Sequence, residues 1–293
     1  MRILPLEKLF RPATSVVYPP FKNGRYLEEF AYEKLVERAE QIQTDLVYVP
    51  VFWTNMQIHP GFPDRKQNYQ TLLDQALATF PADTRYFTIV QHDDGPMLRL
   101  PSNTVVFGAC TGTIPIPLIY EDVTYRLQQE DRTPKTQLAS FVGSATHDMR
   151  RQLIRHLGPN INYNMGGWTD SVSAPAADHF IQDTLKSTFC LAPRGYGRSS
   201  FRYFEAIQLD TIPVYFWDDI EWLPYKEELD YSTFSVSINQ KEITNTYAIL
   251  SSISEEKIKE MQVELKRVKP MFTLDGMVNY VVRVLERPIN GAC

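Results

Sequence analysis

Short apolar, β-branched runs alternate with segments of helical period along the chain. In the first half, four apolar runs predict strands, and the stretches "YLEEFAYEKLVERAEQI" and "NYQTLLDQALATF" between them carry apolar residues near helical spacing. This alternation is typical of α/β layering, in which helices cover an open sheet. The predicted strands cover residues 15–18, 46–52, 86–91 and 104–107.

A polar segment, residues 120–137, separates this set from a second one. There the strand-like "LASFVGS" precedes the helical "HDMRRQLIRHLG", and the apolar runs "TIPVYFW" and "FSVSIN" follow before an amphipathic helix in "SISEEKIKEMQVELKRVKPMF". We therefore predict two α/β domains, 1–135 and 136–270, with the segment 271–293 packing back on the first. Ligands of such folds bind at the carboxyl ends of the strands.

Composition excludes several classes of protein. The chain has 293 residues, 43% of them hydrophobic, and a net charge of −5, which argues against a general nucleic-acid binder. It has no signal-peptide core and no Asn-x-Ser/Thr sequon, and its strongest apolar run, "LVYVPVFW", is too short to span a bilayer. We expect a cytoplasmic protein with no membrane segment, whose three cysteines (Cys110, Cys190 and Cys293) are reduced thiols.

The segment "FVGSATHDMRRQ" is a first candidate anion site. A strand ends at Gly143-Ser144, and the helix that follows carries Arg150 and Arg151. Glycine lets the backbone approach a ligand closely, and the amides at a helix start point toward negative charge. Strand–glycine–helix turns also recur as purely structural features, so both readings stay open.

The stretch 189–219, "FCLAPRGYGRSSFRYFEAIQLDTIPVYFWDD", is a second candidate of the same kind. A basic glycine loop follows an apolar strand, and Ser199 or Ser200 can cap the next helix. Arg202 and Glu205 share one face of that helix. They form either a surface ion pair or part of a site in which arginines hold a diphosphate and the carboxylate holds a sugar diol.

The same stretch resembles the donor-site signature of the exostosin family of glycosyltransferases, from "LAPRGYGRSSFRYFEA" through "IPVYFW" to "LPY". Four further segments resemble the family in consistent order, and the resemblance covers roughly residues 15–272. These segments are "TDLVYVPVFW", "YFTIVQHDDGP", "FVGSATHDMR" and the closing region from "FSVSIN" to "VKPMF".

The resemblance implies a GT-B architecture, in which two Rossmann-like domains face each other across a cleft. The first domain would bind the acceptor and the second the nucleotide sugar. The chain departs from plant members at Asp210-Thr211, where they tend to have glycine, which costs a favoured left-handed helix stop. By position, the implied donor-binding residues are Gly143, Ser144, Arg150, Arg194, Gly195, Ser200, Arg202 and Glu205, the last of these for the ribose.

Glycosyl transfer needs stabilisation of the leaving diphosphate and a base near the acceptor hydroxyl. The chain has no Asp-x-Asp motif, and Asp218-Asp219 read as a solvated strand end, so we expect no metal and metal-independent transfer. Asp93 is the first candidate for the base. His92 beside it and His59 after the preceding strand are the alternatives, and each of the three could equally be a loop cap or an exposed side chain.

We therefore expect an inverting glycosyltransferase that moves a sugar from a UDP-sugar to a hydroxyl of a glycan acceptor. UDP-xylose is the best guess for the donor. A non-catalytic nucleotide-sugar or glycan-binding protein and a GT-B-type UDP-sugar epimerase are the alternatives. The start "MRILPLEKLF" reads like a native beginning, which would fit a large algal DNA virus. The four tryptophans are either core residues or sugar-stacking platforms.

Overall fold

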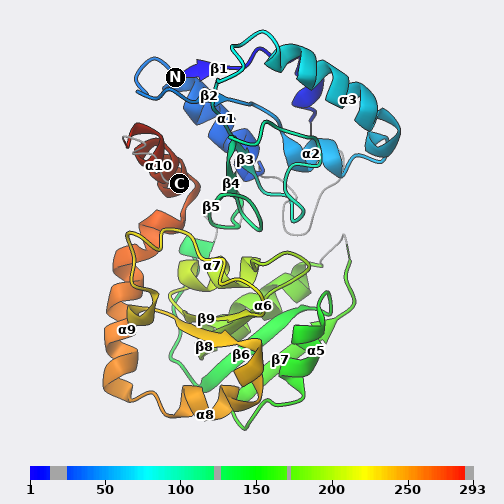
Figure 1. Ribbon diagram of the computed structural model, residues 1–293. Helices are drawn as coiled ribbons and strands as arrows, with labels where there is room; N and C mark the ends of the chain where they lie inside the picture. The colour runs from blue at the N-terminus through cyan, green and yellow to red at the C-terminus, as the bar shows by residue number, and fades with distance from the viewer. Residues whose placement is uncertain (14–24, 122–126, 170–172, 288–293) are drawn as a thin grey trace.

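The computed structural model describes residues 1–13, 25–121, 127–169 and 173–287. Two five-stranded sheets, parallel throughout, lie one in each half of the molecule (Figure 1). The strand orders are β1-β2-β3-β4-β5 and β10-β9-β8-β6-β7. Two Rossmann-like α/β units, as the sequence predicts, are thus confirmed.

The first sheet is built from short apolar runs, and its strands lie side by side in the order in which they occur along the chain. Its strands are β1 (Arg2–Ile3), β2 (Val47–Tyr48), β3 (Tyr86–Val90), β4 (Val105–Gly108) and β5 (Ile114–Pro115). The helices of this half are α1 (Leu27–Glu37), α2 (Trp53–Gln57) and α3 (Phe62–Leu77). Three of the four predicted strands are found, and the fourth, 15–18, lies outside the described residues.

The second sheet is longer-stranded and begins after the polar segment. Its strands are β6 (Gln137–Ser144), β7 (Ile161–Gly166), β8 (Ser187–Pro193), β9 (Ile212–Trp217) and β10 (Val236–Asn239). The helices of this half are α5 (Asp148–Ile154), α6 (Ala174–Lys186), α7 (Phe201–Gln208), α8 (Thr246–Ser251) and α9 (Glu255–Val268). Since β6 and β8 are parallel neighbours, the loops that follow them emerge at one edge of the sheet.

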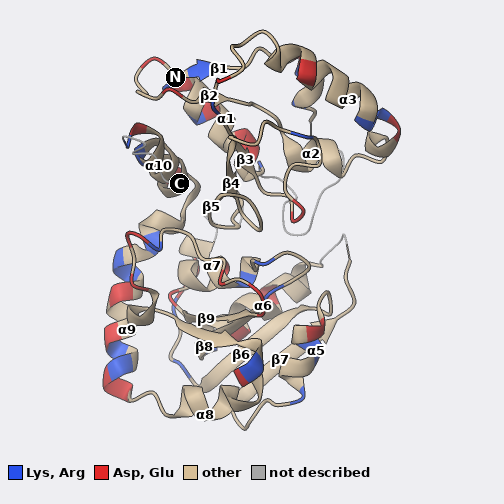
Figure 2. Cartoon of the chain, in the orientation of Figure 1, with Lys and Arg blue, Asp and Glu red and all other residues tan. Residues whose placement is uncertain are grey.

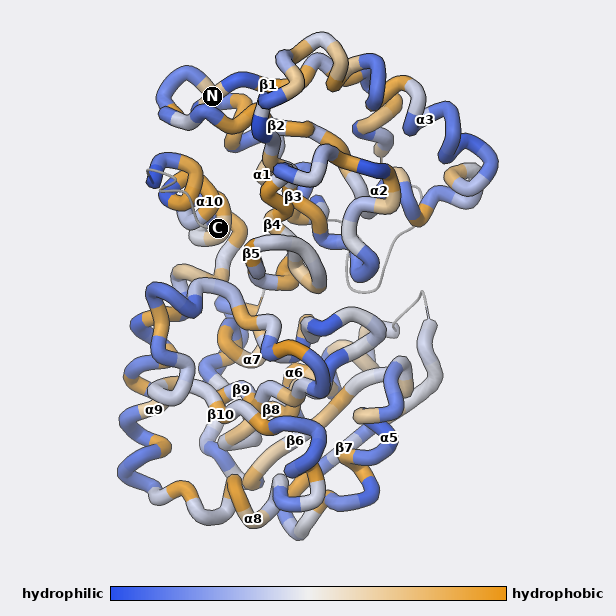
Figure 3. The backbone as a smooth tube through the Cα atoms, viewed as in Figure 1, coloured by the Kyte–Doolittle hydropathy of each residue, from blue (hydrophilic) through white to orange (hydrophobic). Residues whose placement is uncertain are grey.

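Helix α9 has a capped start, charged residues that suit its two ends, and one apolar face. The side chain of Ser254 caps its first turn by accepting a hydrogen bond from the amide of Lys257, and acids in that turn and bases in the last turn complement the helix dipole. Met261, Leu265 and Val268 are buried on its inner stripe. Its outer face alternates blue and red in Figure 2 and is hydrophilic in Figure 3.

The last helix, α10 (Leu274–Glu286), leaves the second domain and packs against α1 of the first. The Arg38 guanidinium donates a hydrogen bond of 2.9 Å to the Asn279 side chain there. One continuous apolar core includes Phe87 of β3, Tyr203 of α7 and Val281 of α10. The two halves therefore share buried apolar surface, which resists their separation in water.

Asp210, which directly follows the C-cap residue of α7, adopts a φ of 54°, in the left-handed region. The left-handed helix stop is therefore retained without glycine, contrary to the expectation from the sequence. Asp and Asn tolerate this region better than most side chains do. The Asp210 carboxylate also accepts hydrogen bonds of 2.8 Å from Arg132 and from Lys269, on the two segments that lead between the domains.

Among the described helices, none is both long enough and apolar enough to cross a membrane.

Candidate active site

A pocket of about 510 Å³ opens between the two domains, where the strands of both sheets end. The first domain contributes the turn 92–94 after β3 together with Leu118. The second domain contributes Ser144, Thr146, Arg150 and Trp168, and from the loop after β8 residues 195–197 and 199–201. The pocket thus has walls from both halves of the molecule.

The structure brings some of the predicted site residues to this pocket and not others. Four predicted donor-binding residues line it, namely Ser144, Arg150, Gly195 and Ser200. Four others lie near it without lining it, namely Gly143, Arg194, Arg202 and Glu205. Of the candidate bases, His92 and Asp93 line the pocket and His59 does not. The catalytic and binding roles of all these residues stay predictions.

Arg150 lines the floor of the pocket and joins the segments that follow β6 and β8. Its guanidinium donates to the backbone oxygens of Ser144 at 2.8 Å, Arg194 at 3.0 Å and Pro193 at 3.2 Å. The side chain is buried, and burial followed by repulsion from Arg202 lowers its pKa to about 10. Arg150 therefore stays cationic at neutral pH and supplies positive charge under the pocket floor.

The loop from β8 to α7 carries two buried polar atoms that have no hydrogen-bond partner among the described residues. They are the Ser200 hydroxyl oxygen and the Arg194 Nε. Ser200 stands at the N-cap of α7 with extended backbone angles, but its side chain makes no cap hydrogen bond. Buried polar groups are nearly always hydrogen-bonded, so such atoms need an explanation, and a bound ligand is one.

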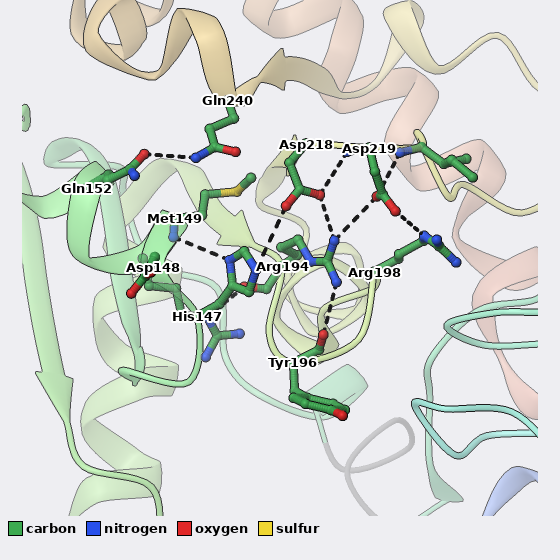
Figure 4. A network of polar contacts seen from close by, with 12 residues as sticks. His147, Asp148, Met149, Gln152, Arg194, Tyr196, Arg198, Asp218, Asp219 and Gln240 are labelled. Atoms are coloured by element: carbon green, nitrogen blue, oxygen red, sulfur yellow. Dashed lines mark hydrogen bonds and ion pairs between the residues drawn. The ribbon is translucent and has the colours of Figure 1, made fainter. Parts of the chain in front are cut away.

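The arginines of the basic loop are held by the acids that follow β9 (Figure 4). The Arg194 Nη1 lies 2.6 Å from Asp218 Oδ1 and 3.3 Å from Asp219 Oδ1. Arg198 Nε lies 2.7 Å from Asp219 Oδ2. Burial is the largest single influence on the pKa of Asp219 and acts to raise it, but the hydrogen bonds from Arg198 and from the Ile220 amide, with the charge of Arg198, together lower that pKa to about 2. The two acids thus lie at the partly exposed end of β9, as the sequence predicts, and in addition they pair with the arginines of the loop.

Arg202 and Glu205 form an ion pair in which Glu205 is buried and Arg202 half-buried, so the alternative of a surface pair is wrong. The Arg202 Nε also donates to the Val142 oxygen at 2.7 Å, and its guanidinium lies 3.8 Å from the Phe180 ring centroid. Glu205 accepts a hydrogen bond from the Tyr120 hydroxyl, which comes from the other side of the domain boundary. Glu205 and Tyr120 both line a small cavity of about 10 Å³, which shares Leu118 and Phe201 with the larger pocket.

Asp93 lies where the two domains touch. The Cys110 thiol donates to Asp93 Oδ1 at 3.0 Å, and a Cβ added at Gly197 would stand only 2.2 Å from the same oxygen. Burial raises the pKa of Asp93, whereas burial lowers the pKa of His92 and outweighs the two neighbouring aspartates. A carboxylate of raised pKa is the stronger base, as a general base requires.

His59 lies in the loop between α2 and α3, where its Nδ1 accepts a hydrogen bond of 3.0 Å from the Gly61 amide. This contact is the local loop cap that the sequence left open as its alternative.

Trp168, which the sequence left as either a core residue or a sugar-stacking platform, lines the pocket and is 59% exposed, so it is not a core residue. Asp94 lines the pocket as well. Thr146 and Tyr196 also line it, and Tyr196 is 65% exposed. The sequence analysis did not assign these two residues to the site, although both lie within its two candidate loops. No group of three or more His, Cys, Asp or Glu side chains that could hold a metal ion occurs among the described residues.

Two parallel α/β domains that face each other across a pocket make this a protein of the GT-B class. The family model of the exostosin GT47 domain matches residues 95–253, more than half of the chain. The chain therefore belongs to the exostosin GT47 family.

Individual relatives are distant. The chain is 27% identical over 118 residues to an exostosin-1 homolog of Caenorhabditis elegans, an alignment that covers 39% of this chain and 30% of that protein. It is 32% identical over 90 residues to a probable beta-1,4-xylosyltransferase, IRX10, of Arabidopsis thaliana, covering 30% and 22% of the two chains. The alignments thus span less than a third of either relative. The crystal structure of TarM superposes on 88% of this chain and 58% of its own, at 7% identity and a TM-score of 0.41.

Proposed function

We propose that the protein is a glycosyltransferase that moves a sugar from a UDP-sugar to a hydroxyl group of a glycan acceptor. The observation that carries the proposal is a pair of buried donors in the loop that leads into α7, Ser200 Oγ and Arg194 Nε, which find no hydrogen-bond partner among the residues that the structure describes. Both are suited to phosphate oxygens, which accept hydrogen bonds and carry negative charge. Membership of the exostosin GT47 family supports the same reaction class.

The donor diphosphate would lie against the start of α7. Helix-start amides and the buried Arg150 cation both favour negative charge there. The glycines at 195 and 197 keep side chains out of this space. Such fixed charges and dipoles stabilise the diphosphate as it leaves, without reorganising at the moment of bond breaking.

The acceptor hydroxyl would approach from the wall of the first domain, where Asp93 lies. With its pKa raised by burial, Asp93 accepts the proton as the new glycosidic bond forms. One displacement of this kind inverts the anomeric configuration. For the donor we keep UDP-xylose as the first candidate, because one relative is named as a probable xylosyltransferase.

We expect transfer without a divalent metal, because the buried Arg150 cation and the amides at the start of α7 offer positive charge to the proposed diphosphate site. Arg194 and Arg198 are paired with Asp218 and Asp219, so they would contribute hydrogen-bond donors rather than net charge. Turnover of the UDP-sugar should be the same in EDTA as in Mn²⁺. Complete loss in EDTA that Mn²⁺ restores would contradict the expectation.

The site itself is tested by Ser200→Ala. Because the Ser200 hydroxyl has no partner within the described part of the chain, its removal should leave thermal stability unchanged or slightly higher. Its loss should weaken the binding of UDP by about tenfold, the worth of one hydrogen bond to a charged group. Isothermal titration calorimetry measures the affinity, and Ser252→Ala, at an exposed serine, is the matched control. Wild-type affinity in Ser200→Ala would remove the site from the proposal.

A further inference from the structure

Glu28, in the first turn of α1, is a carboxylate buried in the first domain, with only 1% of its surface exposed. Isolating a carboxylate from water is costly unless it is well hydrogen-bonded. Burial raises the pKa of Glu28 to about 7, against the opposing effect of its hydrogen bonds. A leucine would fill the space without that cost, so the carboxylate calls for a role.

Three donors converge on this carboxylate. Its Oε2 accepts from the Thr54 amide at 2.8 Å, and its Oε1 accepts from the Thr54 hydroxyl at 2.9 Å and from the Gln91 amide at 2.7 Å. Thr54 lies in the first turn of α2, and Gln91 directly follows β3. One side chain thus joins two helix starts to the end of a strand.

The bond between α1 and the end of β3 is reciprocal. The Gln91 side-chain oxygen accepts from the Leu27 amide at 3.2 Å, while the Glu28 side chain accepts from the Gln91 amide. Leu27 and Gln91 are both at element ends, where backbone amides lack a partner within the element. Each amide is therefore satisfied by a side chain of the opposite element, and we name this arrangement the Glu28–Gln91 clamp.

The clamp stands immediately before the turn that carries the candidate base. Gln91 precedes His92 and Asp93, and Asp93 makes its own contact with the Cys110 thiol only two residues further along. The backbone direction at Gln91 decides where the Asp93 carboxylate arrives. We propose that Glu28 is a positioning residue that, through the amide of Gln91, seats Asp93 in the pocket between the domains. This inference rests on the role proposed for Asp93.

Turnover tests the clamp with two variants of the full chain. In Glu28→Leu all three donors lose their acceptor, and we expect kcat to fall by about tenfold or more with the KM for the UDP-sugar little changed. Glu28→Gln keeps an oxygen that can accept a hydrogen bond from the Gln91 amide, so its kcat should lie between those of the wild type and of Glu28→Leu. Glu37→Gln and Glu37→Leu, at an exposed position of the same helix, are the matched controls and should behave as wild type.

A second readout does not depend on enzyme activity. Cys110 is buried and bonded to Asp93, so iodoacetamide should label it slowly in the native protein. Displacing the turn should raise the labelling rate of Cys110 by about tenfold, measured site by site with mass spectrometry under conditions where circular dichroism shows folded protein. If Glu28→Leu does not fold, Glu28→Gln carries the test, with a smaller rise.

The two readouts separate the clamp from the proposed reaction. Folded Glu28 variants with wild-type kcat and wild-type protection of Cys110 would overturn the inference. Faster labelling of Cys110 in a protein that transfers no sugar would support the clamp while contradicting the proposed function. If the Glu28 variants lost kcat as expected but kept the wild-type protection of Cys110, the inference would also be overturned. Glu28 would then affect turnover by a route other than the position of the turn 92–94.

Discussion

Replacing Arg150 by methionine is expected to lower the free energy of unfolding by about 3 kcal/mol, because three buried or half-buried carbonyl oxygens lose their donors at once. Methionine has a similar length and fills most of the space, so the loss reflects hydrogen bonds more than a cavity. The loops after β6 and β8, which the guanidinium joins, should separate. We therefore also expect UDP binding to be lost at concentrations that saturate the wild type.

Urea unfolding followed by circular dichroism measures this free energy. Arg151→Met is the matched control, because Arg151 is its neighbour on α5 but is half exposed and pairs with Asp148 on the surface. That variant should stay within about 0.5 kcal/mol of wild type. Equal stability of the Arg150 and Arg151 variants would show that the buried guanidinium does not hold the loops.

Gly197→Ala is expected to impair the site by overpacking, whereas the Arg150 variant removes hydrogen bonds. The added Cβ would lie 2.2 Å from Asp93 Oδ1 and 2.7 Å from the Cys110 sulfur, far inside any tolerated contact. Either the basic loop or the turn of Asp93 must move. Overpacking of this kind costs about 1–3 kcal/mol. Because the segment that moves lines the pocket, kcat/KM should fall by about one to two orders of magnitude.

Steady-state kinetics with the UDP-sugar and acceptor measure the effect on the reaction. Gly166→Ala provides the control, because a Cβ there would meet no atom within 4 Å, and it should retain wild-type kinetics. If Gly197→Ala were as active as Gly166→Ala, the contact of Gly197 with Asp93 would not matter for turnover.

The sequence predicts the two α/β units because their longer strands and helices carry clear periodicity. β8, β9 and α9 follow from apolar runs and an amphipathic stripe. The strands β1 and β5 have two residues each, too few to show any period, and they form only because a neighbouring strand pairs with them. Of the predicted strand at 46–52 only Val47–Tyr48 are in regular strand. The Val49 amide still donates to Phe87, and Pro50, which has no amide hydrogen, cannot continue the pairing.

The sequence predicts which segments form the candidate site, but not which side chains contact one another within it. Charge and glycine spacing located the loop after β8, and Ser200 lies in the pocket as expected. The directions of Arg150 and Arg202 were not predictable, because both turn inward onto backbone oxygens that only the packed sheet presents. Likewise, Cys110 reaches Asp93 from a separate strand end, which no local pattern reveals.

The crystal structure of the protein with UDP is the most direct test of the proposed nucleotide-sugar site. We predict the diphosphate in the pocket between the domains, with its oxygens within hydrogen-bonding distance of the Ser200 hydroxyl and of the Arg194 side chain. UDP bound elsewhere, or no bound UDP at millimolar concentration, would contradict the assignment of this pocket as the donor site.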